Sequence, residues 1–287
     1  MLISDMTIYV IPAAMLFIYW CVNKELGKKI VSEITYSFWL NGIIKLTACI
    51  YRPWVQDPRL HVFEDAAGTA TGYSFPSAHT TVTAIGSGNL AVHTRKAIWK
   101  VISIFFILLV MASRLWLGCH SPADVIAGLL IGIGSMFMFM WIDNKLDGCR
   151  DKSLMLLIIA VVVSGLSILY IETKQYPMDY DALGNLIVDP DDMKQDTYLG
   201  IGMILGWTSG NLIEDKLIRF TTEGTVVQKV IRTILGSAVF LGVFSLRKII
   251  FGGCSPSLQK LFAMLMACLA ATVMYPWAFM KWRNRKK

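Results

Sequence analysis

The chain has 287 residues, of which 55% are hydrophobic and only 16% are charged, and its mean hydropathy is +0.55. Soluble domains usually carry about 25% charged residues, so this composition excludes a soluble globular fold, a disordered chain and a collagen-like repeat. The net charge of +7 does not indicate a nucleic-acid partner, because the basic residues lie in short clusters between apolar segments. We therefore expect an all-α, multi-pass bundle of transmembrane helices in a lipid bilayer.

Apolar windows recur along the whole chain, each close to the roughly 20 residues that a helix needs to cross about 30 Å of hydrocarbon. They are residues 7–22, 30–51, 77–94, 97–117, 122–143, 153–173, 197–215, 227–251 and 257–282. The windows predict about nine spans. The first window is short, and the second contains Glu33, Asn41 and Lys45. The predicted organisation is a first span with its turn (1–29), a membrane core (30–173), an acidic exterior loop (174–196) and three additional spans (197–287).

The basic residues predict the orientation of the bundle. Most of the 27 Lys and Arg residues lie in alternate connections and at the C-terminus, in the segments 23–29, 95–100, 144–152, 216–232 and 281–287. Cytoplasmic loops carry such an excess, so this side is predicted to be cytoplasmic. The N-terminus and the connections at 52–76, 118–121 and 174–196 are then exterior.

Unusual polar residues in the first half of the chain cluster near span ends on this exterior side. They are Lys45, Arg52, Ser77, His79, Arg114, His120 and Asp124. Ionisable groups at membrane depth cost about 2 to 3 kcal/mol or more, so a converging set predicts a functional site.

The residue types favour phosphate chemistry. Lysine and arginine side chains match phosphoryl oxygens, and the helix start at Ser77 and Ala78 offers backbone N–H groups to an anion. His120 is a candidate nucleophile, because a carboxylate four residues later, Asp124, can fix its tautomer. His79 is the candidate general acid. The surrounding cations remove the need for a metal or another cofactor.

Structural alternatives exist for several of these residues. Ser121, Pro122 and Asp124 form a capping-box pattern, so Asp124 could serve as a helix cap alone or as cap and catalytic group together. Ser77 after a proline is an ordinary N-cap. Arg52 and Arg114 could be interfacial residues that extend toward water.

Three ordered motifs carry a resemblance to a known family. Lys45-x6-Arg52-Pro53, Pro76-Ser77-Ala78-His79 and Ser113-Arg114-x5-His120-x3-Asp124 resemble the signature of the type 2 phosphatidic acid phosphatase superfamily. The predicted topology is similar to its glucose-6-phosphatase and sphingosine-1-phosphate phosphatase branches. The resemblance implies a six-helix catalytic core within residues 30–173.

The resemblance also implies roles for the residues. His120 would form a phosphohistidine, Asp124 would activate it and His79 would protonate the leaving group, without a metal. The phosphoryl oxygens would be bound by Lys45, Arg52, Ser77, Ala78 and Arg114. The family commonly has glycine where this chain has Ala78; the backbone N–H remains, so we expect an altered rate more than lost activity.

The sequence therefore predicts an integral membrane phosphatase acting on the exterior face. Substrates implied by the resemblance are undecaprenyl pyrophosphate, phosphatidic acid, phosphatidylglycerol phosphate and sphingoid phosphates. A phosphotransferase to a lipid or sugar acceptor and a non-enzymatic anion transporter remain alternatives. A bacterial plasma membrane is the expected location. A glycine stripe, Gly202, Gly206 and Gly210, predicts close helix packing within the chain or between copies of it, which leaves a homo-oligomer open.

Overall fold

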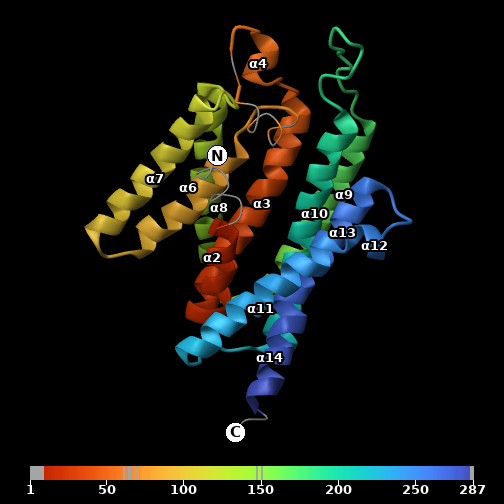
Figure 1. Ribbon diagram of the computed structural model, residues 1–287. Coiled ribbons are helices and arrows are strands. Elements are labelled where there is room, and N and C mark those ends of the chain that lie inside the picture. Colours follow the sequence, from red (N-terminus) through yellow and green to blue (C-terminus); the bar gives the residue numbers. More distant parts are fainter. Residues whose placement is uncertain are drawn as a thin grey trace.

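The computed structural model describes residues 10–284 apart from 61, 64, 65, 67, 69, 71, 147 and 150, and shows a helical bundle (Figure 1). Its helices in chain order are α2 (Ile11–Phe17), η2 (Ile18–Val22), α3 (Lys24–Ala48), α4 (Pro53–Gln56), α6 (Ala78–His93), α7 (Ala97–Trp116), α8 (Pro122–Lys145), α9 (Lys152–Thr173), α10 (Pro190–Ile213), η3 (Glu214–Ile218), α11 (Val226–Ser245), α12 (Arg247–Ile250), α13 (Pro256–Leu269), η4 (Ala270–Met274) and α14 (Tyr275–Asn284). The three η elements are π-helical. Residues 7–9 of the first predicted window lie outside the described residues.

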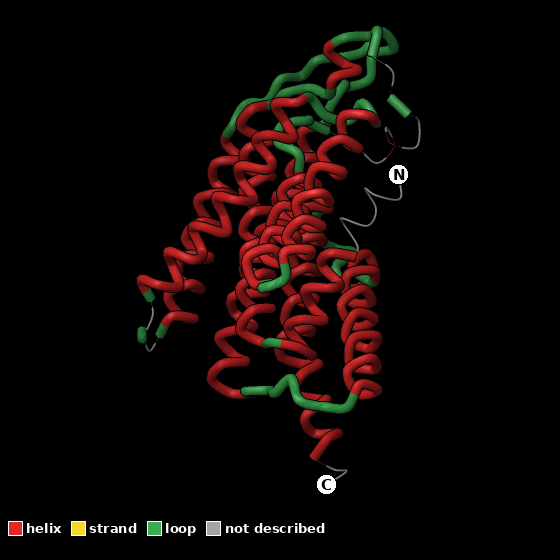
Figure 2. The backbone as a smooth tube through the Cα atoms, turned by 90° about the vertical axis from the view of Figure 1, so that its left-hand side faces the viewer, coloured by secondary structure: helices red, strands yellow, loops and turns green. Residues whose placement is uncertain are grey.

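Helix α3 runs through the middle of the bundle (Figure 1). Helices α6, α7 and α8 lie on one side of it, and α9, α10 and α13 lie on the other. The connections gather at the two ends of the bundle (Figure 2). The chain between α3 and α6, the α7–α8 turn and the α9–α10 connection share one end, which we call the site end. Helix α14 lies at the other end.

Helix caps fix where the segments at the site end begin. Ser77 precedes α6, and its hydroxyl accepts the N–H of Thr80. Ser121 and Asp124 form a complete capping box at the start of α8, with Pro122 in the first turn. The backbone N–H of Ser77 also donates to the carbonyl of Asp124 at 3.0 Å, so the starts of α6 and α8 are tied together.

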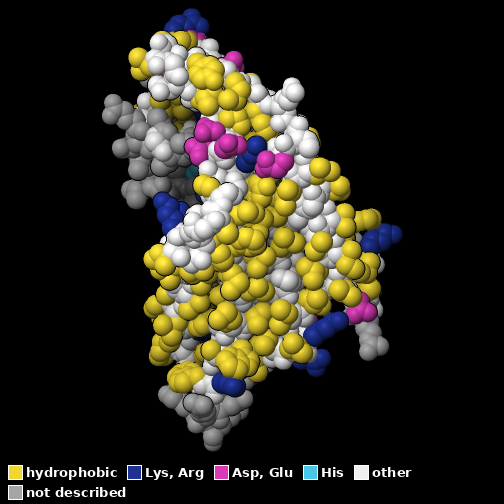
Figure 3. Space-filling view, turned by 90° about the vertical axis from the view of Figure 1, so that its right-hand side faces the viewer, with side chains coloured by type: hydrophobic (Ala, Val, Ile, Leu, Met, Phe, Trp, Pro, Cys, Tyr) yellow, Lys and Arg dark blue, Asp and Glu magenta, His cyan; other side chains and the backbone are white. Residues whose placement is uncertain are grey.

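The outer helices present apolar side chains outward. In α7 the buried residues are Ser103, Val110 and Arg114, whereas Phe105 and Trp116 are exposed. Figure 3 shows the same arrangement on another face, where a wide apolar belt lies between bands of charged residues. This distribution is the one expected of helices whose surroundings are hydrocarbon, because small and polar residues are then used for contacts inside the bundle.

Five helical segments in the described part are long and apolar enough to cross a membrane by length and composition. They are Ala97–Trp116, Pro122–Lys145, Lys152–Thr173, Val226–Ser245 and Pro256–Trp282. A helix overlaps each of the nine predicted windows, yet α6 has only 16 residues and α3 and α10 carry many charged groups. The all-α bundle is confirmed, and the count of nine spans stays a prediction.

Candidate active site

A cavity of about 160 Å³ opens at the site end of the bundle. Six of the eight residues predicted to form a phosphate site line it, and they come from α3, α6, α7 and the connections at the site end. Its lining consists of Phe38, Asn41, Gly42, Lys45, Arg52, Ala70, Ala78, His79, Arg114, His120, Met193 and Asp196. Ser77 and Asp124, the other two predicted residues, are buried behind this lining.

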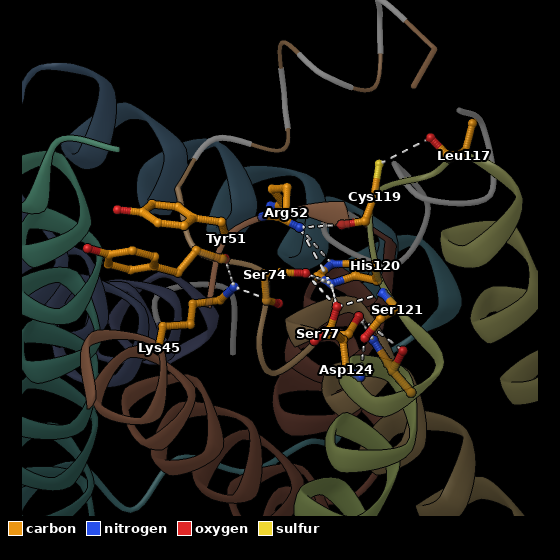
Figure 4. Close-up of polar contacts among 12 residues, drawn as sticks. Lys45, Tyr51, Arg52, Ser74, Ser77, Leu117, Cys119, His120, Ser121 and Asp124 are labelled. Carbon is orange, nitrogen blue, oxygen red and sulfur yellow. Dashed lines mark hydrogen bonds and ion pairs between the residues drawn. The ribbon is translucent and has the colours of Figure 1, made fainter. Parts of the chain in front are cut away.

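His120 lies at the centre of a polar cluster (Figure 4). It is only 5% exposed, and its Nδ1 lies 3.4 Å from Oδ2 of Asp124. The other ring nitrogen, Nε2, lies 3.1 Å from Nη1 of Arg52. A carboxylate oxygen can only accept a hydrogen bond and a guanidinium can only donate, so this arrangement favours the tautomer with hydrogen on Nδ1. The lone pair of the ring is then on Nε2.

The surroundings also keep this imidazole neutral. The pKa of His120 is lowered from 6.5 to about 3, mainly by burial and also by the positive charges of Arg52, Lys45 and Arg114, while the contact with Asp124 opposes the shift. The imidazole is therefore neutral in the physiological pH range, as a nucleophilic nitrogen would require. Arg52 keeps its charge in this range as well, because burial lowers its pKa only to about 10.

Asp124 accepts two hydrogen bonds through one oxygen and contacts His120 through the same oxygen. Its Oδ2 lies 2.6 Å from the backbone nitrogen of Ser121 and 2.5 Å from Oγ of Ser74, in addition to Nδ1 of His120. The residue therefore caps α8 and contacts the imidazole at the same time; the cap is present, and the catalytic role stays a prediction. Such bonds hold a carboxylate ionised and fix its orientation.

Two cations of the cavity are held by neutral carbonyl groups. Lys45 Nζ donates to the carbonyls of Tyr73 and Ser74, at 2.6 and 3.3 Å. Arg52 donates from Nε to the carbonyl of Gly72 and from Nη1 to that of Cys119, at 3.1 and 2.9 Å. Carbonyl oxygens carry no net charge, so these contacts orient a cation without themselves neutralising it.

The helix start and Arg114 complete the wall of the cavity. Ala78 is the first residue of α6, and His79 follows it with its side chain partly exposed. Arg114 is 3% exposed near the end of α7. The N-terminus of α6 carries a partial positive charge, so the helix and the side chains give this wall one sign of charge. Among the described residues, no group of three or more His, Cys, Asp or Glu side chains is placed to hold a metal ion.

Two residues at this site were not predicted from the sequence. Ser74 contacts both His120 and Asp124, since its Oγ lies 3.4 Å from Nδ1 of His120 and 2.5 Å from Oδ2 of Asp124. No spacing rule singles out a serine in an extended segment before a helix. Asn41 was noted only as a polar residue within a span, although its position four residues before Lys45 puts both on one face of α3.

Comparisons with known proteins agree with the motifs. Residues 28–147 match the model of the PAP2 superfamily, and residues 198–287 match that of the PAP2 superfamily phosphatase transmembrane extension. No solved structure matches the chain. With its apolar helices, the match to a transmembrane extension makes this a multi-pass membrane protein.

Three characterised proteins are similar to parts of the chain. An undecaprenyl-diphosphatase of Sulfolobus acidocaldarius is 28% identical over 47% of this chain and 63% of its own length. Lipid phosphate phosphatase delta of Arabidopsis thaliana is 26% identical over 45% of this chain and 34% of its own length. Undecaprenyl-diphosphatase BcrC of Bacillus subtilis is 34% identical over 37% of this chain and 52% of its own length. The matched segments thus span a third to two thirds of these relatives. Because both family models match, over residues 28–147 and 198–287, the chain belongs to the PAP2 superfamily.

Proposed function

We propose that this protein is a membrane lipid phosphatase that hydrolyses a lipid phosphate or diphosphate through a phosphohistidine on His120. The observation that carries the proposal is the position of His120 between Asp124 and Arg52, within a cavity lined by cations. The family match and the names of the three relatives, all phosphatases or diphosphatases, support the same class of reaction.

In the first step, Nε2 of His120 attacks the phosphorus atom and a phosphorus–nitrogen bond forms as the bond to the leaving oxygen breaks. The proton on Nδ1 faces Asp124, whose negative charge stabilises the cationic ring that develops. His79, which must be protonated at this point, gives its proton to the leaving oxygen; the negative charge of the bound phosphate offsets the surrounding cations and favours this protonated form. Lys45, Arg52 and Arg114, with the backbone N–H at Ala78, bind the equatorial oxygens as charge develops there.

In the second step, water attacks the phosphohistidine and the phosphorus–nitrogen bond breaks. His79, now neutral, takes a proton from the attacking water, and phosphate leaves with His120 restored. Arg52 contacts Nε2 in the structure. When substrate binds, its guanidinium must therefore shift so that the phosphorus atom can approach Nε2.

A lipid substrate fits the size and place of the cavity. About 160 Å³ admits a phosphoryl group and its nearest atoms, but not a long chain. The cavity lies at the end of apolar helices, where a lipid can present its phosphate while its chain stays in hydrocarbon. Undecaprenyl diphosphate, phosphatidic acid, phosphatidylglycerol phosphate and sphingoid phosphates all meet this condition.

The test is phosphate release by the purified protein in detergent with excess EDTA. The substrates are an isoprenyl diphosphate, phosphatidic acid, phosphatidylglycerol phosphate, a sphingoid phosphate and glucose 6-phosphate. We expect wild type to act on a lipid substrate and His120→Ala to lose roughly a thousandfold or more in kcat. His93→Ala removes an imidazole at the opposite end of α6 and should retain full activity.

The covalent step has its own readout. With phosphorus-labelled substrate, wild type should carry an acid-labile label that His120→Ala lacks, because a phosphoramidate bond hydrolyses in acid. Turnover of His120→Ala at the wild-type rate would refute the nucleophile. Transfer of phosphate to an added alcohol would indicate a phosphotransferase, and the absence of any release would favour an anion-binding role without chemistry.

A further inference from the structure

Asn41 carries a buried oxygen that has no hydrogen-bond partner among the described residues. The residue is 3% exposed and lines the phosphate cavity. Its Nδ2 donates to the carbonyl of Ser37 at 2.8 Å. A flip of the amide would place an oxygen against that carbonyl, so the bond fixes Oδ1 on the remaining side. An unsatisfied buried acceptor costs about 1 to 3 kcal/mol, and such a cost at a cavity wall points to a ligand that supplies a donor.

The position of Asn41 along α3 says where that donor would lie. Phe38, Asn41 and Lys45 all line the cavity and follow helical spacing on one face of α3. At 1.5 Å per residue, Asn41 lies about 6 Å and Phe38 about 10 Å further from the site end than Lys45. The lining thus passes from a cation to an amide acceptor to an aromatic ring. A lipid phosphate has the same order, from its phosphate through its polar carbons to its chain.

A second acceptor lies on α10, which packs against α3. Asp196 of α10 lines the same cavity, and its Oδ1 is held 3.0 Å from Lys260 Nζ of α13. Its side chain is 53% exposed, so it stands at the mouth of the cavity rather than deep within it. A carboxylate beside three cations does not improve binding of a bare phosphate. It does suit an amino or hydroxyl group attached close to that phosphate.

We infer that Asn41, assisted by Asp196, selects lipid phosphates that carry an amino or hydroxyl group within a few bonds of the phosphoester oxygen. The substrate group donates to Oδ1 of Asn41 while the phosphate contacts Lys45 and Arg52. Isoprenyl phosphates and diphosphates have no such donor on their chains and would leave Oδ1 unsatisfied. The inference rests on the proposed phosphatase function and names the substrate class of that site.

The test compares two substrates that differ only in the donor groups. Sphinganine 1-phosphate and octadecyl phosphate share the saturated chain and the terminal phosphate, but only the first has amino and hydroxyl groups on the neighbouring carbons. We expect wild type to favour sphinganine 1-phosphate in kcat/KM, and Asn41→Leu to lower that preference about tenfold or more. Leucine keeps the side-chain volume and removes the acceptor.

Asn211→Leu is the matched control. Asn211 of α10 is also buried, and its Oδ1 also lacks a partner among the described residues, but it lies at the other end of the bundle. Its replacement should leave the substrate ratio unchanged. An isoprenyl diphosphate completes the panel as a lipid substrate without a donor on its chain.

The outcomes distinguish a failure of the role inferred for Asn41 from a failure of the proposed phosphatase function. An equal kcat/KM of wild type for the two phosphates, or the same fall for both in Asn41→Leu, would overturn the role of Asn41. Release from the isoprenyl diphosphate alone would also overturn it and leave the phosphatase proposal standing. Absence of release from every substrate would overturn both.

Discussion

Ser74 joins the two groups on which the proposed chemistry depends. Its hydroxyl lies 2.5 Å from Oδ2 of Asp124 and 3.4 Å from Nδ1 of His120, and the residue is 1% exposed. The serine therefore holds the carboxylate in the position from which it fixes the imidazole tautomer. It does not reach the phosphoryl oxygens, since it is not part of the cavity lining. We regard it as a positioning residue.

Ser74→Ala should lower kcat by about 10- to 100-fold, because a hydrogen bond to a charged group contributes about 1.5 to 3 kcal/mol. KM should change little, since the residues that bind the phosphate are retained. Steady-state kinetics on one lipid substrate checks this. Ser164→Ala, at a buried serine of α9, is the control and should behave as wild type. A rise in KM with unchanged kcat would contradict the positioning role.

Among the residues of the candidate site, the sequence predicted those that stand at fixed spacings within recognisable motifs. Lys45, Arg52 and His120 follow motif spacings, and the structure places them on one cavity. Ser74 and Asn41 were not predicted as site residues, because their importance depends on which segments lie next to them in the folded chain. The partner of Ser74 is 50 residues away in the chain, and an unpaired oxygen such as Asn41 Oδ1 is visible only once all neighbours are placed.

Helices α10 and α13 show how small residues determine packing between elements. A Cβ at Gly202 would overlap the carbonyl of Leu261, and one at Gly206 would lie 2.6 Å from that of Leu265. A Cβ at Gly210 would overlap Oγ1 of Thr272 in η4. The predicted glycine stripe thus packs within the chain. It brings α10 and α13 to backbone contact at Gly202 and Gly206, and it leaves room for the side chain of Thr272 at Gly210.

Gly202→Ala should destabilise the fold by about 1 to 3 kcal/mol, because the added methyl group meets backbone rather than a movable side chain. The matched control is Gly165→Ala in α9, where a Cβ meets nothing within 4 Å and alanine favours the helix by up to about 1 kcal/mol. Denaturation in detergent should therefore show a lower free energy of unfolding than wild type for Gly202→Ala and a higher one for Gly165→Ala. Equal stability of both would show that α10 and α13 do not depend on close approach.

Apolar windows located the helices because hydrocarbon selects strongly for composition, but they placed some ends imperfectly. Helix α10 begins at Pro190, with Asp189 as its cap, so residues 190–196 of the predicted acidic loop are helical. Hydropathy misses a first turn that contains Asp191 and Asp192, although acidic residues there stabilise a helix. The π-helical η2, η3 and η4 carry no sequence pattern that separates them from ordinary helix.

At the scale of the whole molecule, the two ends of the bundle use their charges differently. The end opposite the site has the larger cavity, about 1130 Å³, but its lysines are paired with carboxylates. Lys28 lies 2.5 Å from Asp215, and Lys152 lies 2.6 Å from Asp143. At the site end, Lys45 and Arg52 donate to carbonyls instead. The smaller cavity is therefore a candidate anion site, in which these contacts orient the cations through uncharged groups.

The same asymmetry supports an orientation for the bundle. The end opposite the site holds most of the basic connections, so it should face the cytoplasm and the cavity should face the exterior. Two exposed positions report on the two ends. Leu183 in the α9–α10 connection is 86% exposed, and Val226 at the start of α11 is 77% exposed.

Single substitutions Leu183→Cys and Val226→Cys, each in a Cys149→Ser background because Cys149 is also exposed, make a matched pair for labelling. In intact cells a membrane-impermeant maleimide should label Leu183→Cys and spare Val226→Cys, and permeabilised cells should label both. The reverse pattern would place the phosphate cavity on the cytoplasmic face, because the α9–α10 connection and the cavity share one end of the bundle. Substrate would then have to come from the inner leaflet, so this labelling experiment decides which leaflet supplies the lipid.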